Sequence, residues 1–140
     1  MKINVILTRQ PVHSFAPGAP GSDTENGAFL DFFGVVRGTE LKKKIAGIDY
    51  SAYEKMAEKE LHRIIAELAK SHPVAEVTLI HRLGFVSAGE ASLLVRVASA
   101  HRAEALAMMD RLITEMKRDV PIWKKVVSFN TQNTVNTPTL

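Results

Sequence analysis

Two stretches with helical periodicity, separated by runs of β-prone residues, constrain the fold of this chain most strongly. Apolar residues recur at helical spacing over residues 53–68 and again over residues 105–116, and Pro121 ends the second pattern. Ser51 and Glu54 have the spacing of a capping box, which predicts that Ser51 caps the first helix. Two such helices among several strands indicate an α+β fold.

The strands are predicted from alternating or β-rich apolar runs. These runs cover residues 2–8, 27–37, 45–50, 74–81, 91–98 and 124–129. Residues 27–37 hold one acidic residue in an apolar run, which is typical of a central strand covered on both faces. Gly84 and Gly89 mark a turn region between two of the runs, so we expect the strands on either side of it to pair antiparallel. Ser99 is predicted to cap the second helix. The expected architecture is a mixed or antiparallel sheet with two main helices.

Residues 1–140 are expected to form a single domain. A chain of 140 residues, with 46% hydrophobic and 24% charged residues, has the composition of one globular domain and can bury a core without disulfides or a structural metal. Residues 10–26 are rich in proline and glycine, which predicts a flexible loop. Residues 130–140 are uncharged and rich in Asn and Thr, which predicts an irregular tail.

Several classes of function are excluded by what the sequence lacks. The chain has no cysteine, which excludes thiolate nucleophiles, zinc ribbons and a persulfide carried on the chain itself. It also has no P-loop, dinucleotide-binding, zinc-protease or nucleophile-elbow motif. The histidines show no metal-ligand spacing, so neither a metal nor a cofactor is expected.

The charge and hydropathy patterns argue against nucleic acid and membranes as partners. The net charge of +3 is small, and aromatic residues do not interleave with basic ones as they do on a platform for single-stranded nucleic acid. No run approaches the roughly 20 apolar residues that cross a bilayer, and the first strand has no signal-peptide core. We therefore expect a cytoplasmic protein.

Cationic residues at the ends of predicted elements are the candidates for an anion-binding site. His101 and Arg102 open the second helix, where unpaired backbone N–H groups and the helix dipole favour a phosphate. A solvated arginine, next to a histidine that only packs at the helix start, would explain the same pair. Arg37 ends an apolar strand and would project into a cleft at the sheet edge, or simply into water. His81 and Arg82 end another strand in the same way and are given a supporting role at most.

Two lysines flank Pro121 and the single tryptophan of the chain. Lys117 lies in the last turn of the second helix, where the helix dipole alone accounts for a cation. Lys124 follows Trp123, and a tryptophan anchored in the core would fix where the ammonium group can reach. A lysine held near other cations loses its proton more readily, so a clustered lysine is a candidate general base or nucleophile.

Short motifs in a fixed order carry a resemblance to one family. They are Phe33–Arg37, Tyr50–Glu58, Ile80–Gly84, Gly89–Ser92, Ser99–Arg102 and Lys117–Lys125. Over residues 27–125 the chain resembles the large catalytic subunit of molybdopterin synthase. One departure is Val126, which stands where that family usually has an acidic residue.

The resemblance implies an α/β hammerhead-type fold, a homodimer and a sulfur transferase of molybdenum cofactor biosynthesis. A small ubiquitin-like sulfur-carrier subunit, which ends in a Gly-Gly thiocarboxylate, would dock on each protomer and donate the sulfur. The acceptor would be cyclic pyranopterin monophosphate, a pterin phosphate that two rounds of transfer convert to molybdopterin.

The resemblance also implies roles for the cationic residues. It implies that Lys117 and Lys124 are catalytic, with Lys117 as the principal catalytic lysine. The substrate-binding residues that it implies are Arg37, His101, Arg102, Lys117, Lys124 and Lys125. The alternative function is that of a non-catalytic paralogue, whose cations bind a phosphorylated ligand or a carrier-protein tail. Lys117 separates the two functions, since a simple anion site would tolerate arginine there and proton transfer would not.

Overall fold

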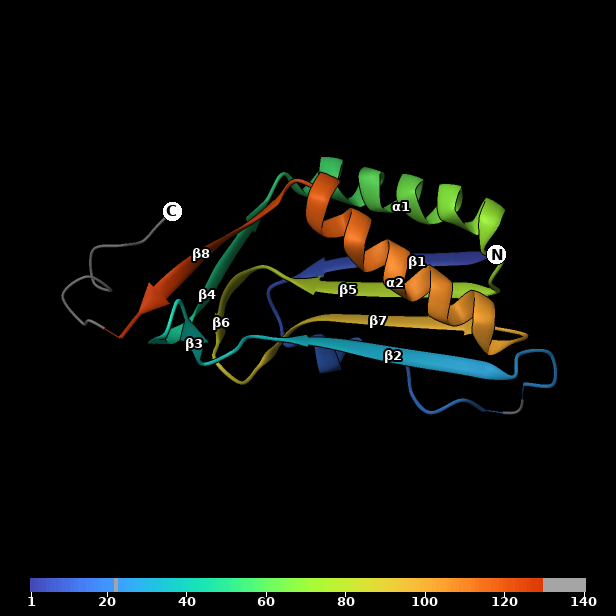
Figure 1. Cartoon of the computed structure of the whole chain (residues 1–140), viewed down its shortest axis with the longest axis horizontal. Helices are drawn as coiled ribbons and strands as arrows, with labels where there is room; N and C mark the ends of the chain where they lie inside the picture. Colours follow the sequence, from blue (N-terminus) through green and yellow to red (C-terminus); the bar gives the residue numbers. More distant parts are fainter. Residues whose placement is uncertain (22, 130–140) are drawn as a thin grey trace.

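The computed structural model describes residues 1–21 and 23–129, so the tail predicted at 130–140 lies outside the described residues. The described residues form two sheets of four strands each. The larger one, which has more residues in its strands, has the strand order β1-β5-β7-β2 (Figure 1). These strands are β1 (Lys2–Thr8), β5 (Glu76–Arg82), β7 (Ala91–Ser99) and β2 (Ala28–Val35). β1 and β5 are parallel, whereas β7 is antiparallel to both of its neighbours. The sheet is therefore mixed, and the predicted antiparallel pairing of β5 with β7 is confirmed.

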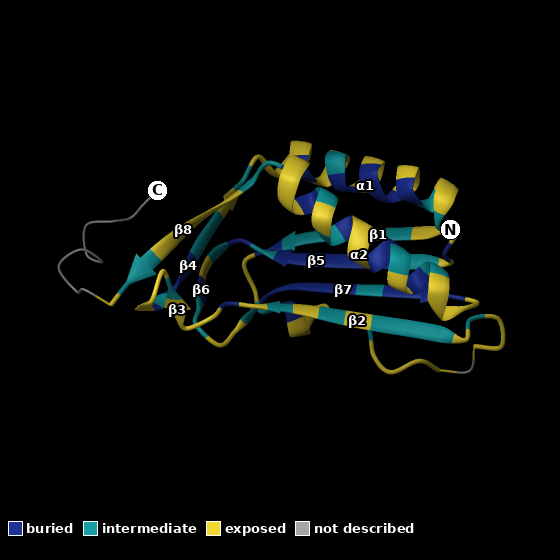
Figure 2. Cartoon of the chain, in the orientation of Figure 1, coloured by how far each residue is buried: buried dark blue, intermediate teal, exposed yellow. Residues whose placement is uncertain are grey.

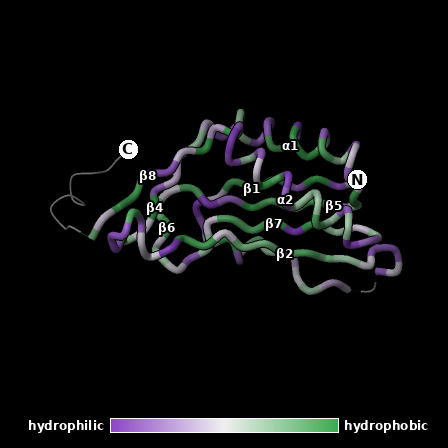
Figure 3. Tube along the Cα trace, viewed as in Figure 1, coloured by the Kyte–Doolittle hydropathy of each residue, from purple (hydrophilic) through white to green (hydrophobic). Residues whose placement is uncertain are grey.

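Two helices, α1 (Glu54–Ser71) and α2 (Arg102–Asp119), lie side by side on one face of this sheet (Figure 1). Each helix turns its buried, hydrophobic side to the sheet and its hydrophilic side outward (Figure 2, Figure 3). Fully buried side chains between the two layers include Leu61, Ile65, Met108, Leu112, Leu79 and Val95. Burial of these apolar surfaces is the main favourable term in folding, and it fixes both helices against the sheet. Neither of these two helices is long and apolar enough to cross a membrane.

A second, smaller sheet projects from one end of this two-layer unit (Figure 1). Its strands are β3 (Thr39–Glu40), β4 (Lys43–Ala52), β6 (Gly84–Ser87) and β8 (Ile122–Ser128). β4 is the centre of this sheet, because it pairs antiparallel with β3, β6 and β8. β6 occupies the region where the sequence predicted only a turn. Gly84, which begins it, and Gly89, in the turn after it, have φ angles of 82° and 93°.

The opposite face of the larger sheet is covered in part by the segment between β1 and β2. A short 3-10 helix, η1 (Val12–Ser14), buries Val12 against Ile80 and Leu94. The loop predicted over residues 10–26 therefore contains η1, and it contributes a residue to the core.

The prediction that residues 27–37 form a central strand covered on both faces is wrong. β2 is an edge strand, and its residues Phe33 and Val35 are 52% and 51% exposed. The run is apolar on both faces, but within one chain only the face toward the helices is covered. Sequence patterning cannot distinguish an uncovered apolar face from a buried one.

Neither of the predicted helix caps is present. Ser51 belongs to β4, where it lies opposite Trp123 of β8, and the residue before α1 is Tyr53. Ser99 ends β7, and its hydroxyl donates to the backbone oxygen of His101, which precedes α2. In both places strand pairing continues almost to the start of the helix. The serine that local spacing predicts as a helix cap is therefore part of a strand.

Candidate functional site

A cavity of about 620 Å³ lies where the C-terminal end of α2 meets both sheets. Its walls come from α2, from β2, β5 and β7 of the larger sheet, and from the smaller sheet through β3, β4 and β8. The polar side chains among the lining residues are Arg37, Glu40, Tyr50, His81, Ser92, Lys117, Trp123 and Lys124. Phe32, Ile48 and Met116 are among the apolar ones. An apolar cleft with a few converging polar groups is the usual form of a small-molecule site.

Pro121 sets the relative position of the two lysines predicted to be catalytic. α2 ends at Asp119, before the proline as the sequence predicts, and Lys117 lies in its last turn. Beyond Pro121 the chain continues as β8, whose pairing with β4 places Lys124 opposite Tyr50. Both lysines line the cavity, one from each side of this break in the chain.

Arg37 reaches the cavity from the end of β2. The backbone before it is fixed, because the N–H of Val36 donates to the oxygen of Glu90 at 2.9 Å and the N–H of Gly89 donates to the oxygen of Val36 at 2.8 Å. Val36 itself is buried. The base of the Arg37 side chain is therefore held in place, while the residue as a whole is exposed and lines the cavity.

The cavity lining carries an excess of positive charge. Among the described residues, Arg37, Lys117 and Lys124 have no carboxylate within ion-pair distance. Glu40 supplies a carboxylate elsewhere in the lining. Arg37, Lys117 and Lys124 are exposed, and a cleft lined by one sign of charge attracts ions of the other sign, so the cavity suits a phosphate, carboxylate or thiocarboxylate. No group of three or more His, Asp or Glu side chains within residues 1–21 and 23–129 could hold a metal ion.

His81 is a lining residue to which sequence reasoning gave only a supporting role. It lies on β5, is 6% exposed, and presents its ring edge-on to the ring of Tyr50, with centroids 5.1 Å apart. Burial lowers the pKa of His81, against the smaller opposing effect of a hydrogen bond to the backbone of Arg82. The ring is therefore neutral at pH 7. The burial of His81 could have been predicted from the alternation of β5, because that alternation places His81 on the same face as the core residue Leu79.

Three of the predicted site residues lie away from the cavity within one chain. His101 and Arg102 stand at the start of α2, and a helix rise of about 1.5 Å per residue separates Arg102 from Lys117 by about 22 Å. Lys125 follows Lys124 on β8, and strand alternation turns its side chain to the opposite face. The predicted residues that the structure brings together are Arg37, Lys117 and Lys124.

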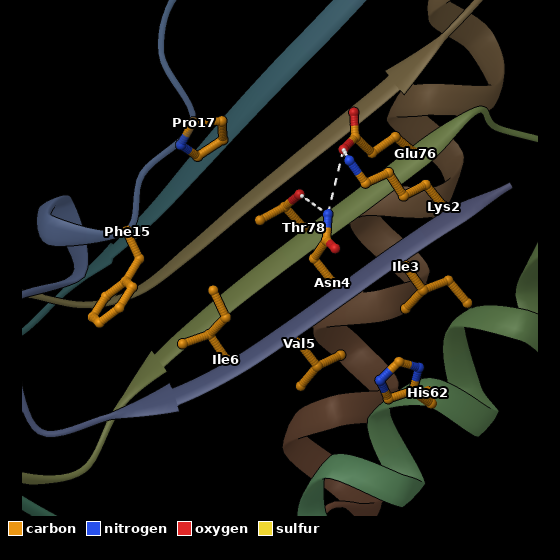
Figure 4. A pocket seen from close by; sticks show the side chains of 10 residues that line it. All are labelled: Lys2, Ile3, Asn4, Val5, Ile6, Phe15, Pro17, His62, Glu76 and Thr78. Carbon is orange, nitrogen blue, oxygen red and sulfur yellow. Dashed lines mark hydrogen bonds and ion pairs between the residues drawn. The ribbon is translucent and has the colours of Figure 1, made fainter.

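A second hollow, of about 490 Å³, lies along the outer edge of β1 (Figure 4). Four of its polar side chains already bind one another. Asn4 donates to Thr78 at 3.2 Å and to Glu76 at 3.4 Å, and Lys2 lies 3.8 Å from the Glu76 carboxylate. None of the predicted site residues lines this hollow, so the cavity at the end of α2 is the candidate functional site.

Comparison with known proteins gives one consistent result. The family model described as MoaE protein matches residues 8–119. The molybdopterin synthase catalytic subunit of Homo sapiens is 40% identical over 101 residues, which cover 72% of this chain and 54% of that protein. The molybdopterin synthase catalytic subunit of Pyrococcus abyssi is 36% identical over 107 residues, which cover 76% of this chain and 72% of that protein. The chain spans about half the length of the mammalian relatives that it matches.

Solved structures share the fold. A molybdopterin synthase structure from Staphylococcus aureus superposes with a TM-score of 0.76 at 28% identity, and the match covers 91% of each chain. A chain from a complex of subunits 1 and 2 of molybdopterin-converting factor from Helicobacter pylori superposes with a TM-score of 0.66 at 22% identity, covering 91% of this chain and 90% of that one. The predicted α+β fold is thus confirmed both by its elements and by its structural neighbours.

Proposed function

The chain belongs to the MoaE family, and from this premise we propose that it is the catalytic subunit of a molybdopterin synthase. The proposed reaction transfers sulfur from the C-terminal thiocarboxylate of a small sulfur-carrier subunit to cyclic pyranopterin monophosphate, and two transfers give molybdopterin. The observation that carries the proposal is the cavity in which Arg37, Lys117 and Lys124 lie together, without a carboxylate partner among the described residues.

The cations of the cavity match the charges of both reactants. The substrate has a phosphate, the carrier tail brings a thiocarboxylate, and negative charge develops on oxygen while the carbon–sulfur bond breaks. Arg37 suits the phosphate, because its planar fork of N–H donors can make two parallel hydrogen bonds to one anion. Lys124 supplies a fixed positive charge from β8, close to where a carrier tail would enter beside Trp123.

Lys117 is the proposed chemical residue. The last turn of α2 fixes the base of its side chain, next to the buried Met116. In its neutral form the amine takes a proton from the substrate or attacks the thiocarboxylate carbon. At the end of each transfer the carrier's carbon–sulfur bond is broken, and the sulfur has replaced an oxygen substituent on a substrate carbon. Water has converted the carrier end to a carboxylate, and the displaced oxygen leaves as water or stays on the phosphate.

We also propose a homodimer in which the β2 strands of two copies pair antiparallel. β2 lies at the edge of the larger sheet, and it exposes Phe33 and Val35. An edge strand with apolar side chains is a template for pairing with another chain. A sedimentation-equilibrium mass of a single chain at micromolar concentration would contradict this part of the proposal.

This dimer would account for His101 and Arg102. The N–H of Gly27 donates to the oxygen of Ala100 at 3.2 Å, so the start of β2 and the start of α2 lie together. A two-fold axis through antiparallel β2 strands places the start of β2 of one copy beside the end of β2 of the other. His101 and Arg102 of the second copy would then stand near the Arg37 of the first, and would bring their charge to its cavity.

The carrier subunit would dock on an exposed aromatic pair beside the cavity. Tyr53 and Trp123 meet edge-on, with ring centroids 4.9 Å apart, and are 64% and 50% exposed. Met56 on the first turn of α1 is also exposed, at 57%. Because Trp123 lines the cavity as well, a carrier body bound to this pair could place its C-terminal tail in the site.

We further propose that residues 1–140 act as one domain and that the protein works in the cytoplasm. The single-domain proposal is supported by the cavity, whose walls come from both sheets, so neither sheet could hold the site alone. Cell fractionation with an antibody against the chain would test the location.

The alternative of a non-catalytic paralogue receives no support. The Homo sapiens and Pyrococcus abyssi relatives are both named as catalytic subunits. A simple anion site would tolerate arginine at position 117, whereas proton transfer requires lysine. The chain has Lys117 at this position, and it lines the cavity.

A single-turnover assay tests the proposed function. The purified chain is mixed with thiocarboxylated carrier and cyclic pyranopterin monophosphate, and molybdopterin is measured after oxidation to a fluorescent product. We expect product in proportion to thiocarboxylate, and none with a carrier that ends in an ordinary carboxylate. Lack of product with the thiocarboxylated carrier, from a folded protein, would contradict the proposal.

A further inference from the structure

The main chain holds the His81 ring in one protonation pattern. Nδ1 of His81 lies 2.7 Å from the backbone oxygen of Arg82. A carbonyl oxygen accepts hydrogen bonds and has no proton to give, so Nδ1 must carry the ring hydrogen. In the neutral ring, the lone pair that can accept a hydrogen bond is therefore on Nε2.

Nε2 of His81 is available to the cavity. Nδ1 is turned to the strand, so Nε2 lies toward the far end of a ring that lines the cavity together with Lys117 and Lys124. Within the described part of the chain, Nε2 has no hydrogen-bond partner, and the one side-chain atom found both sealed from solvent and unpartnered is Nε of Arg82. Nε2 is therefore not sealed from solvent, and it belongs to a ring that lines the cavity.

The ring plane is also fixed. The edge-on contact with Tyr50, at an interplanar angle of 76°, and the hydrogen bond to Arg82 constrain the ring in two directions. An acceptor held this way loses little conformational freedom when it binds, which is the condition for a selective contact.

We propose that Nε2 of His81 accepts a hydrogen bond from a ring N–H of the pterin substrate. The inference rests on the proposed function and adds a residue that selects the heterocycle. Arg37, Lys117 and Lys124 offer only donors when charged, so they bind the acidic groups of a ligand but cannot recognise its N–H groups. A pterin carries both kinds of group, and a fixed neutral acceptor rejects analogues that lack the donor, because it is then left unpaired.

Two substitutions separate a ligand contact from a structural role. In His81→Gln the side-chain amide reaches the position of Nε2 and keeps an acceptor there. In His81→Asn the shorter amide reaches the position of Nδ1 and keeps a donor for the backbone oxygen of Arg82. His62→Gln, on the exposed face of α1, is the matched control. For each protein we would measure the Kd of cyclic pyranopterin monophosphate by calorimetry, KM and kcat of sulfur transfer, and the melting temperature.

We expect His81→Asn to raise the Kd and KM of the pterin about tenfold, with kcat changed less than about threefold, because loss of a buried hydrogen bond acts mainly on binding. His81→Gln should stay within about threefold of the natural protein in Kd. A purely structural role of His81 predicts the reverse order, in which His81→Asn equals or exceeds His81→Gln in both pterin affinity and melting temperature. That result would overturn the proposal. An effect confined to carrier affinity, with the pterin Kd unchanged, would overturn it as well.

Failure of the proposed function gives a different result, since the natural protein would then neither bind the pterin nor transfer sulfur. The state of His81 can be tested without any ligand by nitrogen-15 NMR at pH 7, using the imidazole signal that disappears in His81→Gln. We expect a neutral ring with its hydrogen on Nδ1. A charged ring, or a hydrogen on Nε2, would overturn the proposal whatever the protein catalyses.

Discussion

Arg96 and Asp31 form a two-point ion pair across β7 and β2, with Nε 2.6 Å from Oδ1 and Nη2 2.8 Å from Oδ2. The same guanidinium group donates through Nη1 to the backbone oxygen of Gly18, in the segment between β1 and β2. The Arg96 side chain is 11% exposed, and its hydrogen bonds to Asp31 raise the pKa of the guanidinium group above its ordinary value. One arginine thus ties the edge strand β2 to the loop that covers the back of the sheet.

Replacing Arg96 by lysine should lower the free energy of unfolding by about 1–2 kcal/mol, because lysine keeps the charge but cannot contact both Asp31 oxygens and Gly18 together. Urea unfolding would measure the change. Arg63→Lys is the matched control, because Arg63 forms a similar two-point pair with Glu60 on the exposed side of α1. Equal losses in the two variants would show that the contact of Arg96 with the loop adds nothing.

Gly47 on β4 allows the close approach of β6. A Cβ atom at this position would lie 2.2 Å from the oxygen of Val86 and 2.7 Å from the ring of Phe85. We expect Gly47→Ala to lower the free energy of unfolding by about 2 kcal/mol or more, because β6 must shift away from β4. Gly38→Ala is the control, because a Cβ atom there would have no neighbour within 4 Å. Similar melting temperatures for the two variants would contradict the prediction.

Lys117→Arg should abolish nearly all sulfur transfer and leave carrier binding intact, since arginine keeps the charge and cannot readily lose a proton. Lys124→Arg should retain a measurable part of the activity, because its proposed role is electrostatic. Single-turnover rates with thiocarboxylated carrier would be compared for both variants, alongside carrier affinity. A Lys117→Arg protein with close to the natural rate would show that another residue does the chemistry.

Mixing two impaired variants tests whether the site is shared between copies. In the proposed dimer, each cavity takes Lys117 from one chain and Arg102 from the other. A dimer of one Lys117→Arg chain with one Arg102→Ala chain therefore has one fully natural cavity and one doubly altered cavity. We expect the mixed dimer to recover about half of the natural activity per dimer. No recovery, in a mixture shown to exchange chains, would place Arg102 outside the site.

His81 should make the stability of the fold depend on pH. Its pKa is lower in the folded chain than its ordinary value of 6.5, because burial disfavours the charged ring. Between these two pKa values the unfolded chain binds a proton that the folded chain does not, so stability rises with pH. The contribution is complete above pH 6.5 and is lost as the pH falls through the lower, folded-state pKa. Urea unfolding from about pH 7.5 to about pH 5 should show this slope in the natural protein and a shallower one in His81→Gln.

The parts of the site that could be predicted from the sequence are those set by local chain geometry. Pro121 must end a helix, so Lys117 at a helix end and Lys124 on the following strand could both be expected. Their meeting in one cavity depends on how β8 pairs with β4, which no local pattern specifies. His81 was undervalued for the same reason, since its importance comes from Tyr50 on another strand.

The wrong predictions come from long-range pairing that overrides local signals. Ser51 has the spacing of a helix cap, but pairing with Trp123 keeps it in β4. The run that forms β2 is apolar enough for a central strand, and nothing in its own residues shows that it lies at an edge. The length of α2 separates His101 and Arg102 from Lys117 within one chain, so their place in the site stays a prediction that depends on the proposed dimer.

Within the described residues, β8 is hydrogen-bonded in the sheet to β4 alone, and Ile122 is the residue by which it packs against the main core between the helices and the larger sheet. A strand with one partner can detach locally while the rest of the fold stays intact. Because β8 carries Lys124 and the Trp123 wall of the cavity, each detachment would dismantle the site without melting the core. We therefore expect activity to be lost on heating at the temperature where this peripheral strand detaches, below the temperature at which the hydrophobic interior melts.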